Sequence, residues 1–226
     1  MVVEEGQLLP GRALPFAGEC RWLISLDYDE TLRSSDAAQP VPMAFFELMR
    51  SWRPLGIRWG INTGRTLPYL CEELLPASPF LPDFICTCER YAYAVQEDGL
   101  LYPLQEHNAR CYVHNMEVRE RVTPLLHAQL DLLRKQLPDL QWIIAPTDPL
   151  SVEAEDAATM DGIMAFLVPF LATLEGVAAQ RAGRYMRLAD SRYCKGSALQ
   201  AVAQQWQVPA ERWVMLGDGH NDMHAF

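Results

Sequence analysis

The sequence has no cysteine pair of the C-x-x-C form, no basic leader and no long apolar run. Its six cysteines therefore give little support to a zinc site or a redox motif, and free thiols in a reducing cytoplasm are the simplest interpretation. The longest apolar stretch, between Asp161 and Glu175, is interrupted by Pro169 and is too short to cross a bilayer. The N-terminus does not resemble a signal peptide. These absences predict a cytoplasmic protein without a membrane partner.

Positive charge is also scarce, because 19 Lys and Arg residues face 29 Asp and Glu residues, which leaves a net charge of −10. Such a surface repels phosphate backbones, so we expect no nucleic-acid partner. A small anionic substrate stays compatible with this charge, since one local site can be positive within an acidic protein. The hydrophobic share of 50% in 226 residues is enough for one large domain or two small ones. We expect a monomer or a weak dimer.

The beginning and the end of the chain carry the patterns of an α/β sheet. Apolar runs predict buried strands over residues 21–26, 57–61, 83–87 and 213–216. Helices are predicted after Pro42, over residues 68–75, and after Ser197 as a capping residue. Alternating strands and helices are typical of a parallel sheet. Because such a sheet ordinarily has a covering helix after its last strand, we expect the domain to continue beyond Phe226.

The middle of the chain has a different pattern. Thr123 before Pro124 predicts a helix start, and leucines at positions 126, 130, 133 and 137 mark one face of that helix. Hairpins are predicted over residues 140–154 and 177–189, on either side of a helix over residues 157–174. Residues 105–188 therefore predict an inserted α+β lobe of αββαββ order, and residues 1–104 and 189–226 predict the sheet domain.

Polar clusters stand where the predicted strands end, which is where open α/β sheets bind ligands. The clusters are Asp27-Tyr28-Asp29-Glu30-Thr31, Asn62-Thr63-Gly64-Arg65 and Gly217-Asp218-Gly219-His220-Asn221-Asp222, with Lys195 before a helix. Several carboxylates without a matching His or Cys set favour Mg²⁺ over Zn²⁺. A carboxylate can also act as a nucleophile, and Thr63, Lys195 and the Gly64 amide are donors suited to a phosphoryl group. Each cluster alone could be a simple turn or helix cap.

Taken in order, the four clusters resemble the four motifs of the haloacid dehalogenase (HAD) superfamily of phosphohydrolases. The insertion resembles the C2-type cap of its Cof-like, sugar-phosphatase branch. The resemblance implies a Rossmann-like parallel-sheet core with an inserted αββαββ cap. It also implies an Mg²⁺-dependent phosphatase that acts on a small phosphorylated metabolite, most specifically a sugar phosphate. A phosphomutase or phosphotransferase of the same fold, and a non-catalytic metabolite-binding protein, are the alternatives.

The resemblance also implies residue roles. Asp27 would be the nucleophile, and Asp29 would protonate the leaving oxygen and later activate water. Thr63, Gly64, Lys195 and Asn221 would bind the phosphate, and Asp27, Asp29 through its carbonyl, Asp218 and Asp222 would hold Mg²⁺. Arg65, Arg90, Arg110 and His114 are weaker candidates for substrate contacts, the alternative being exposed polar residues.

Two departures from the family pattern stand out. Glu30 occupies a position where the family often has Gly, directly before Thr31. Cys88-Glu89-Arg90 replaces the Asn-Gly-Ala stretch that is usual in this branch. The second departure concerns the substrate groove rather than the phosphoryl chemistry.

Overall fold

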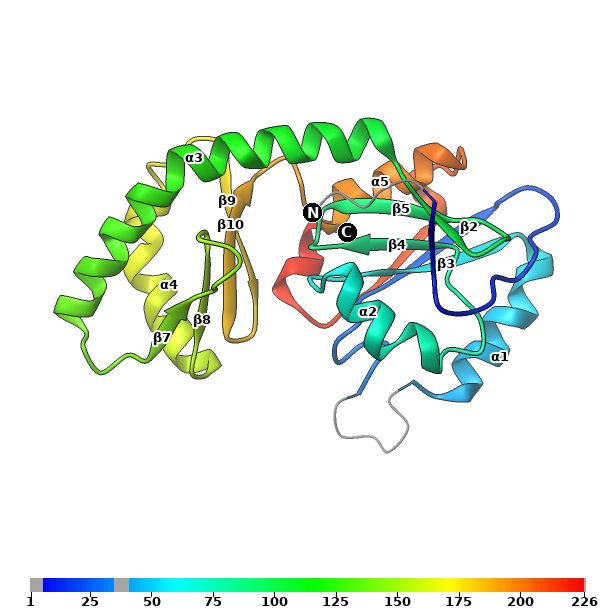
Figure 1. The fold of residues 1–226 in the computed structure, drawn as a ribbon, viewed down its shortest axis with the longest axis horizontal. Helices are drawn as coiled ribbons and strands as arrows, with labels where there is room; N and C mark the ends of the chain where they lie inside the picture. The colour runs from blue at the N-terminus through cyan, green and yellow to red at the C-terminus, as the bar shows by residue number, and fades with distance from the viewer. Residues whose placement is uncertain (1–5, 35–40, 226) are drawn as a thin grey trace. The chain divides into compact units, whose positions relative to one another are not determined.

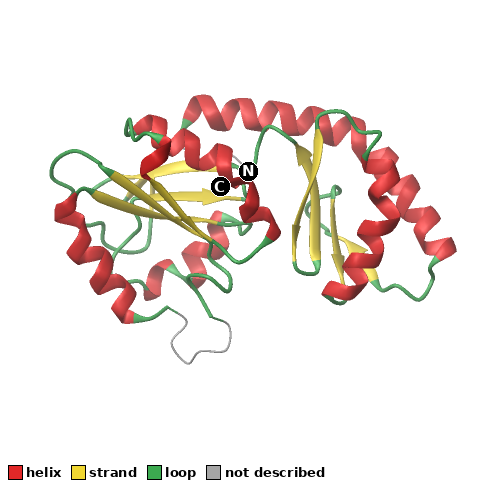
Figure 2. Ribbon diagram, turned by 180° about the vertical axis from the view of Figure 1, so that it is seen from behind, coloured by secondary structure: helices red, strands yellow, loops and turns green. Residues whose placement is uncertain are grey.

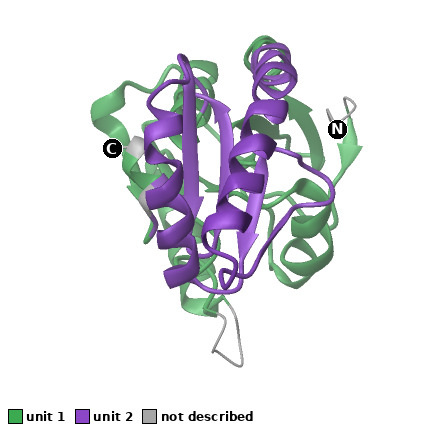
Figure 3. Cartoon of the chain, turned by 90° about the vertical axis from the view of Figure 1, so that its left-hand side faces the viewer, with its two compact units in different colours: residues 1–110, 194–218, 222–226 green, residues 111–193, 219–221 purple. Residues whose placement is uncertain are grey.

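The computed structural model describes residues 6–34 and 41–225, which form two compact units (Figure 1, Figure 3). Unit 1 comprises residues 1–110, 194–218 and 222–226, and unit 2 comprises residues 111–193 and 219–221. Phe226, beyond which the sheet domain was expected to continue, lies outside the described residues. None of the helices in the described ranges combines the length and the apolar character that crossing a membrane requires.

Unit 1 is built on a mixed sheet with a parallel centre, whose described strands have the order β1-β6-β5-β4-β3-β2-β11. These strands are β1 (Gln7–Leu8), β2 (Trp22–Leu26), β3 (Ile57–Asn62), β4 (Phe84–Thr87), β5 (Tyr91–Val95), β6 (Leu100–Pro103) and β11 (Trp213–Leu216). The pairs β11–β2, β2–β3 and β3–β4 are parallel, which confirms the predicted α/β class. The antiparallel strands β5, β6 and β1 were not predicted.

Both faces of this sheet are covered by helices. Ile24 belongs to a buried cluster with Phe46 of α1 (Met43–Trp52) and Leu70 of α2 (Leu67–Glu73). Leu23, one residue earlier, packs in a second cluster with Leu199 of α5 (Lys195–Gln205). Successive side chains of a strand point to opposite faces, so a sheet covered on both sides needs continuous apolar strands. The short 3-10 helices are η1 (Arg53–Leu55), η2 (Leu75–Ala77), η3 (Ala210–Arg212) and η4 (His220–Ala225).

Unit 2 packs two helices against an antiparallel sheet (Figure 2, Figure 3). Its described strands have the order β7-β8-β10-β9, with β7 (Trp142–Ile144), β8 (Ser151–Ala154), β9 (Val177–Ala182) and β10 (Tyr185–Asp190). The helices are α3 (Gln105–Gln136), which begins in unit 1, and α4 (Ala157–Leu171), whose N-cap Asp156 accepts a hydrogen bond from the Thr159 amide at 2.7 Å. The elements follow one another in the predicted αββαββ order.

The predicted helix start at Thr123-Pro124 is wrong, because α3 runs through this position without interruption. Proline lacks the N–H that would bond to the carbonyl four residues earlier, yet it removes only one hydrogen bond of a long helix. The apolar stripe explains the continuity, since Val118, Val122 and Leu126 are buried at intervals of four residues on both sides of Pro124. The Thr123 hydroxyl is buried without a hydrogen-bond partner and caps nothing.

Ser197 is not the N-cap of α5, as the sequence suggested, because Cys194 occupies that position. Ser197 is the third residue of the helix, and its hydroxyl accepts a hydrogen bond from the Cys194 amide at 2.9 Å. This bond satisfies a backbone donor at the helix start from inside the helix. The helix therefore begins at Lys195, which places that lysine in its first turn.

Candidate active site

Three parallel strands of unit 1 bring the predicted site residues to one edge of the sheet. Asp27 directly follows β2, Thr63 directly follows β3, and Asp218 lies two residues after the end of β11. The Asp27 amide donates to the carbonyl of Leu216 at 2.8 Å, so the ends of β2 and β11 remain paired where the polar residues begin. Parallel strands present their carboxyl ends together, and the loops that follow them can converge on a ligand.

Lys195 joins two carboxylates in the interior of this edge. Its side chain is fully buried, and its Nζ lies 2.8 Å from Asp27 Oδ1 and 2.6 Å from Asp222 Oδ1. Asn62, the last residue of β3, donates from Nδ2 to the carbonyl of Lys195 at 2.9 Å and so ties the start of α5 to the sheet. The sequence placed Asn62 in the polar cluster at the end of this strand but gave it no individual role.

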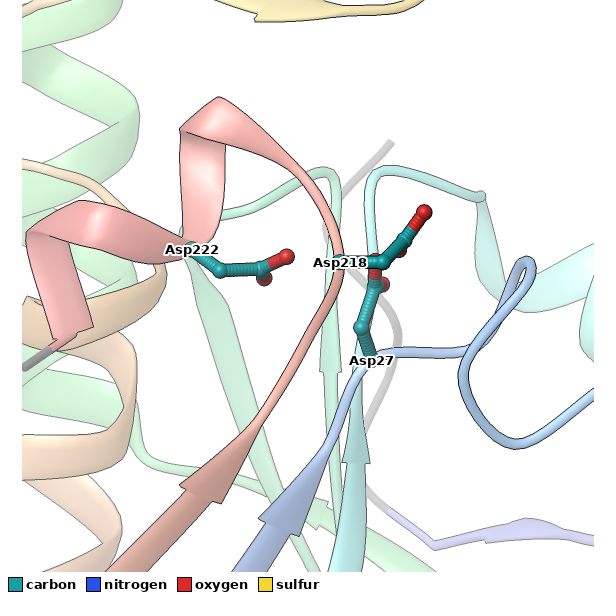
Figure 4. Close-up of side chains that lie close together, drawn as sticks. All are labelled: Asp27, Asp218 and Asp222. Atoms are coloured by element: carbon teal, nitrogen blue, oxygen red, sulfur yellow. The ribbon is translucent and has the colours of Figure 1, made fainter.

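Three carboxylates gather at this position (Figure 4). Asp27, Asp218 and Asp222 can each offer an oxygen atom, and these atoms all lie within 4.8 Å of one another. The Thr31 hydroxyl donates to Asp218 Oδ1 at 3.2 Å. A set of carboxylate oxygens suits a hard divalent cation such as Mg²⁺, because such a cation prefers oxygen ligands. The donor chemistry of these residues therefore fits the metal that the sequence implied.

Gly217 allows the close approach of Asp222 to the end of β11. A Cβ atom at position 217 would lie only 2.2 Å from Asp222 Cγ, a separation that non-bonded atoms do not adopt. The buried Asp222 carboxylate thus takes the space where any other residue type would place its side chain. Glycine is required here for space rather than for an unusual backbone angle.

Burial dominates the electrostatics of Asp27. It raises the pKa of Asp27 from 3.8 to about 6, although the ammonium of Lys195 lowers it. Burial alone would lower the pKa of Lys195, but the carboxylates of Asp27 and Asp222 outweigh this effect and raise it. The lysine is therefore held in its charged form, which is the form that can bind an anionic group.

Asp29 lies outside the three-carboxylate group and is held by Arg65. The Arg65 guanidinium lies over the Tyr69 ring, 4.6 Å from its centroid, and the Arg65 amide donates to Thr63 Oγ1 at 3.1 Å. The Tyr69 hydroxyl accepts a hydrogen bond from Arg33 at 3.0 Å. Arg65, predicted as a weak substrate contact, thus connects the loop after β3 to the side chain of Asp29. Tyr69 and Arg33 were not predicted.

The remaining predicted residues have separate environments. Asn221 is buried. The Arg90 carbonyl accepts a hydrogen bond from His107 Nε2 at 2.7 Å, and Arg110 pairs with Glu106 on α3. His114 Nδ1 lies 2.8 Å from the Tyr193 hydroxyl. The substrate and phosphate contacts expected of these four residues stay predictions.

His114 also lines a cavity of about 400 Å³ within unit 2. Acidic and basic groups share its wall, and Arg192 is paired there with Asp190 at 2.7 Å. The Arg121 guanidinium donates to the Glu175 carbonyl at 2.9 Å. One ion pair and one hydrogen bond from a guanidinium to a backbone carbonyl therefore link residues of this wall.

Solved structures share this fold. A sucrose-phosphatase from Synechocystis sp. PCC6803, in complex with sucrose and phosphate, superimposes with a TM-score of 0.64 at 20% identity, over 92% of this chain and 80% of that chain. A haloacid dehalogenase-like hydrolase from B. subtilis gives 0.57 at 17% identity, over 90% and 85%. A sugar phosphatase of HAD subclass IIB gives 0.52 at 13% identity, over 89% and 82%. At these low identities, the TM-scores show a shared fold and no more.

A comparison with curated proteins finds no match. The sequence profile of the haloacid dehalogenase-like hydrolases, in contrast, matches residues 89–226, which is more than half of the chain. This segment contains Lys195, Asp218 and Asp222, and the structure brings all three together with Asp27. The chain therefore belongs to the haloacid dehalogenase-like hydrolase family.

Proposed function

We propose that the protein is an Mg²⁺-dependent phosphatase that hydrolyses a small phosphorylated metabolite, most specifically a sugar phosphate, through an aspartyl-phosphate intermediate. The observation that carries this proposal is the buried Lys195 ammonium, which contacts both Asp27 and Asp222. A positive charge in this place partly offsets the repulsion between an anionic nucleophile and an anionic phosphate ester.

In the first step, an Asp27 carboxylate oxygen attacks the phosphorus atom and the bond from phosphorus to the ester oxygen breaks. Asp29 gives a proton to the departing oxygen, which leaves as an alcohol. Lys195 and the loop of Thr63 and Gly64 bind the phosphoryl oxygens. Because Asp222 is a second carboxylate in contact with Lys195, it keeps the ammonium in place while Asp27 forms its bond to phosphorus.

In the second step, Asp29 takes a proton from a water molecule, whose oxygen attacks the phosphorus atom. The bond between phosphorus and the Asp27 oxygen breaks, so that inorganic phosphate leaves and the Asp27 carboxylate is regenerated. Asp27, Asp218 and Asp222, with the Asp29 carbonyl, would hold Mg²⁺, which when bound supplies positive charge against the phosphoryl oxygens. Asp29 gives one proton in the first step and takes one in the second, so its protonation state is restored at the end of the cycle.

The sugar-phosphate class is supported by the fold shared with a sucrose-phosphatase and a subclass IIB sugar phosphatase. We further propose that residues 105–188 act as a cap that selects the substrate. The decisive experiment is hydrolysis of a panel of phosphorylated sugars and nucleotides with Mg²⁺, measured as released inorganic phosphate. We expect activity that chelation abolishes and that Asp27→Asn removes. Phosphate transfer to a second sugar without phosphate release would instead indicate a phosphomutase, and binding without turnover would indicate a metabolite sensor.

A further inference from the structure

The turn between β4 and β5 has an unusual backbone for its residues. Cys88 and Glu89 have positive φ angles of 51° and 65°, and the Arg90 amide donates to the Thr87 carbonyl at 3.1 Å. β-turns with positive φ at both central positions favour Asn-Gly, because other side chains collide with the backbone there. The chain therefore keeps a cysteine and a glutamate in a conformation that costs stability.

This turn is bonded directly to the loop that follows β3. The Glu89 amide donates to the Thr63 carbonyl at 2.9 Å, and the Cys88 amide donates to the Arg65 carbonyl at 3.0 Å. The Glu89 side chain covers Gly64, since a Cβ atom placed on Gly64 would lie 3.2 Å from Glu89 Oε1. Glu89 is only 6% exposed. A largely buried carboxylate thus rests on the loop proposed to bind the phosphate.

A carboxylate is a poor neighbour for a phosphate dianion, because the two negative charges repel each other at low dielectric. It is a good acceptor for hydroxyl groups, and hydrogen bonds to a charged acceptor are stronger than neutral ones. A side chain that strains the backbone and places a carboxylate on the loop proposed to bind the phosphate points to a functional use of its chemistry.

We propose that Glu89 is a specificity-determining residue, which accepts hydrogen bonds from substrate hydroxyl groups beside the phosphate ester. The same carboxylate disfavours substrates that carry a second anionic group at that place. This proposal rests on the proposed phosphatase function. It assigns the preference for polyhydroxylated monophosphates to the turn between β4 and β5, in addition to any contribution of the proposed cap.

The test compares kcat/KM of the wild type, Glu89→Gln and Glu89→Gly on glucose 6-phosphate, phenyl phosphate and fructose 1,6-bisphosphate. We expect the ratio of glucose 6-phosphate to phenyl phosphate to fall about tenfold in both variants, chiefly through KM, because a charged hydrogen-bond acceptor is lost. The relative rate on the bisphosphate should rise. Glu89→Gly should also raise the melting temperature, since glycine adopts positive φ freely. If the glycine variant folds poorly, Glu89→Gln still tests the proposal, because glutamine keeps the shape of the glutamate side chain and removes its charge.

Gln207→Gly provides the matched control. Gln207 also has a positive φ, of 54°, and it lies in the exposed turn after α5. This variant should raise the melting temperature and leave all substrate ratios unchanged. Substrate ratios that stay constant in both Glu89 variants, while the wild type hydrolyses the esters, would overturn the role of Glu89 alone. A wild type that hydrolyses none of these esters would overturn the proposed function, and this proposal with it.

Discussion

The guanidinium of Arg65 holds the carboxylate of Asp29 with two hydrogen bonds, from Nε to Oδ2 at 2.8 Å and from Nη2 to Oδ1 at 3.1 Å. Such a fork fixes the plane of the carboxylate, which a lysine cannot do because its ammonium is a point charge. The cation–π contact with Tyr69 in turn fixes the guanidinium. Arg65 is therefore a positioning residue for the proposed proton donor.

This relationship predicts a dependence on the leaving group. Arg65→Lys should lower kcat on a sugar phosphate by roughly ten- to a hundredfold, because a misplaced general acid forfeits part of its contribution. The loss on p-nitrophenyl phosphate should be much smaller, since nitrophenolate leaves without a proton. Steady-state kinetics on both esters measure the difference. Arg50→Lys, at an exposed position of α1, is the control. An equal loss on both esters would show that Arg65 does not act through proton transfer.

The raised pKa of Asp27 predicts that Mg²⁺ affinity depends on pH. The carboxyl group is neutral below about 6 in the metal-free protein, and Mg²⁺ binds the charged carboxylate. The apparent Kd should therefore rise as pH falls, by about tenfold for each pH unit below that value. Calorimetric titration with MgCl₂ from about pH 5 to about pH 8, a range that brackets the raised pKa of Asp27, tests this expectation.

Asp27→Asn should remove most of this pH dependence, while Asp131→Asn on the exposed side of α3 should retain it. The asparagine cannot lose or gain a proton in this range, so its oxygen binds the metal equally well throughout. A pH slope that persists in Asp27→Asn would assign the titrating group to another residue.

Lys195 is also predicted to be important for stability. Lys195→Ala would leave two buried carboxylates, Asp27 and Asp222, without their shared counter-ion. Removing one partner from a buried ion pair costs about 3–5 kcal/mol. Urea unfolding in the presence of a chelator should show this loss of free energy of unfolding. Lys135→Ala is the matched control, because Lys135 is the other lysine of the sequence and is exposed. A loss no larger than that of Lys135→Ala would contradict the ion-pair assignment.

The sequence predicted the parallel strands well because both faces of that sheet are covered, which favours nearly continuous apolar runs such as residues 22–26, where Ser25 is the polar exception. It also placed Asp27 and Asp218 correctly at strand ends. The first half of α3 was missed, since Pro124 resembled a helix start when only the leucines after it were counted. The local preference of Thr123-Pro124 for a helix start was overridden by the tertiary packing of the whole helix.

Other features depend on contacts between distant segments, which no local pattern encodes. The bond between Arg33 and Tyr69 joins residues 36 positions apart, and Asn62 reaches Lys195 across 133 positions. The positive φ angles of Glu30 and Glu89 are likewise invisible in a sequence, because neither residue type favours them. Both lie at the two places where the chain departs from the family pattern, so the departures become interpretable only with the backbone in view.

Gly217 yields the final prediction. Gly217→Ala would place a methyl group only 2.2 Å from the carboxyl carbon of Asp222, so one of the two groups must move. Because Asp222 is buried and bonded to Lys195, its displacement should disturb both the lysine and the carboxylate group. We expect kcat to fall by roughly a hundredfold and Mg²⁺ binding to weaken, in line with the cost of small misplacements in active sites.

Gly162→Ala is the control, since its added methyl group would make only an ordinary contact, 3.5 Å from Leu140, within α4. That control should retain full activity and gain helix stability. A Gly217→Ala protein with unchanged turnover and Mg²⁺ affinity would show that the position of Asp222 is not needed for catalysis, and the proposed site would then have to function without it.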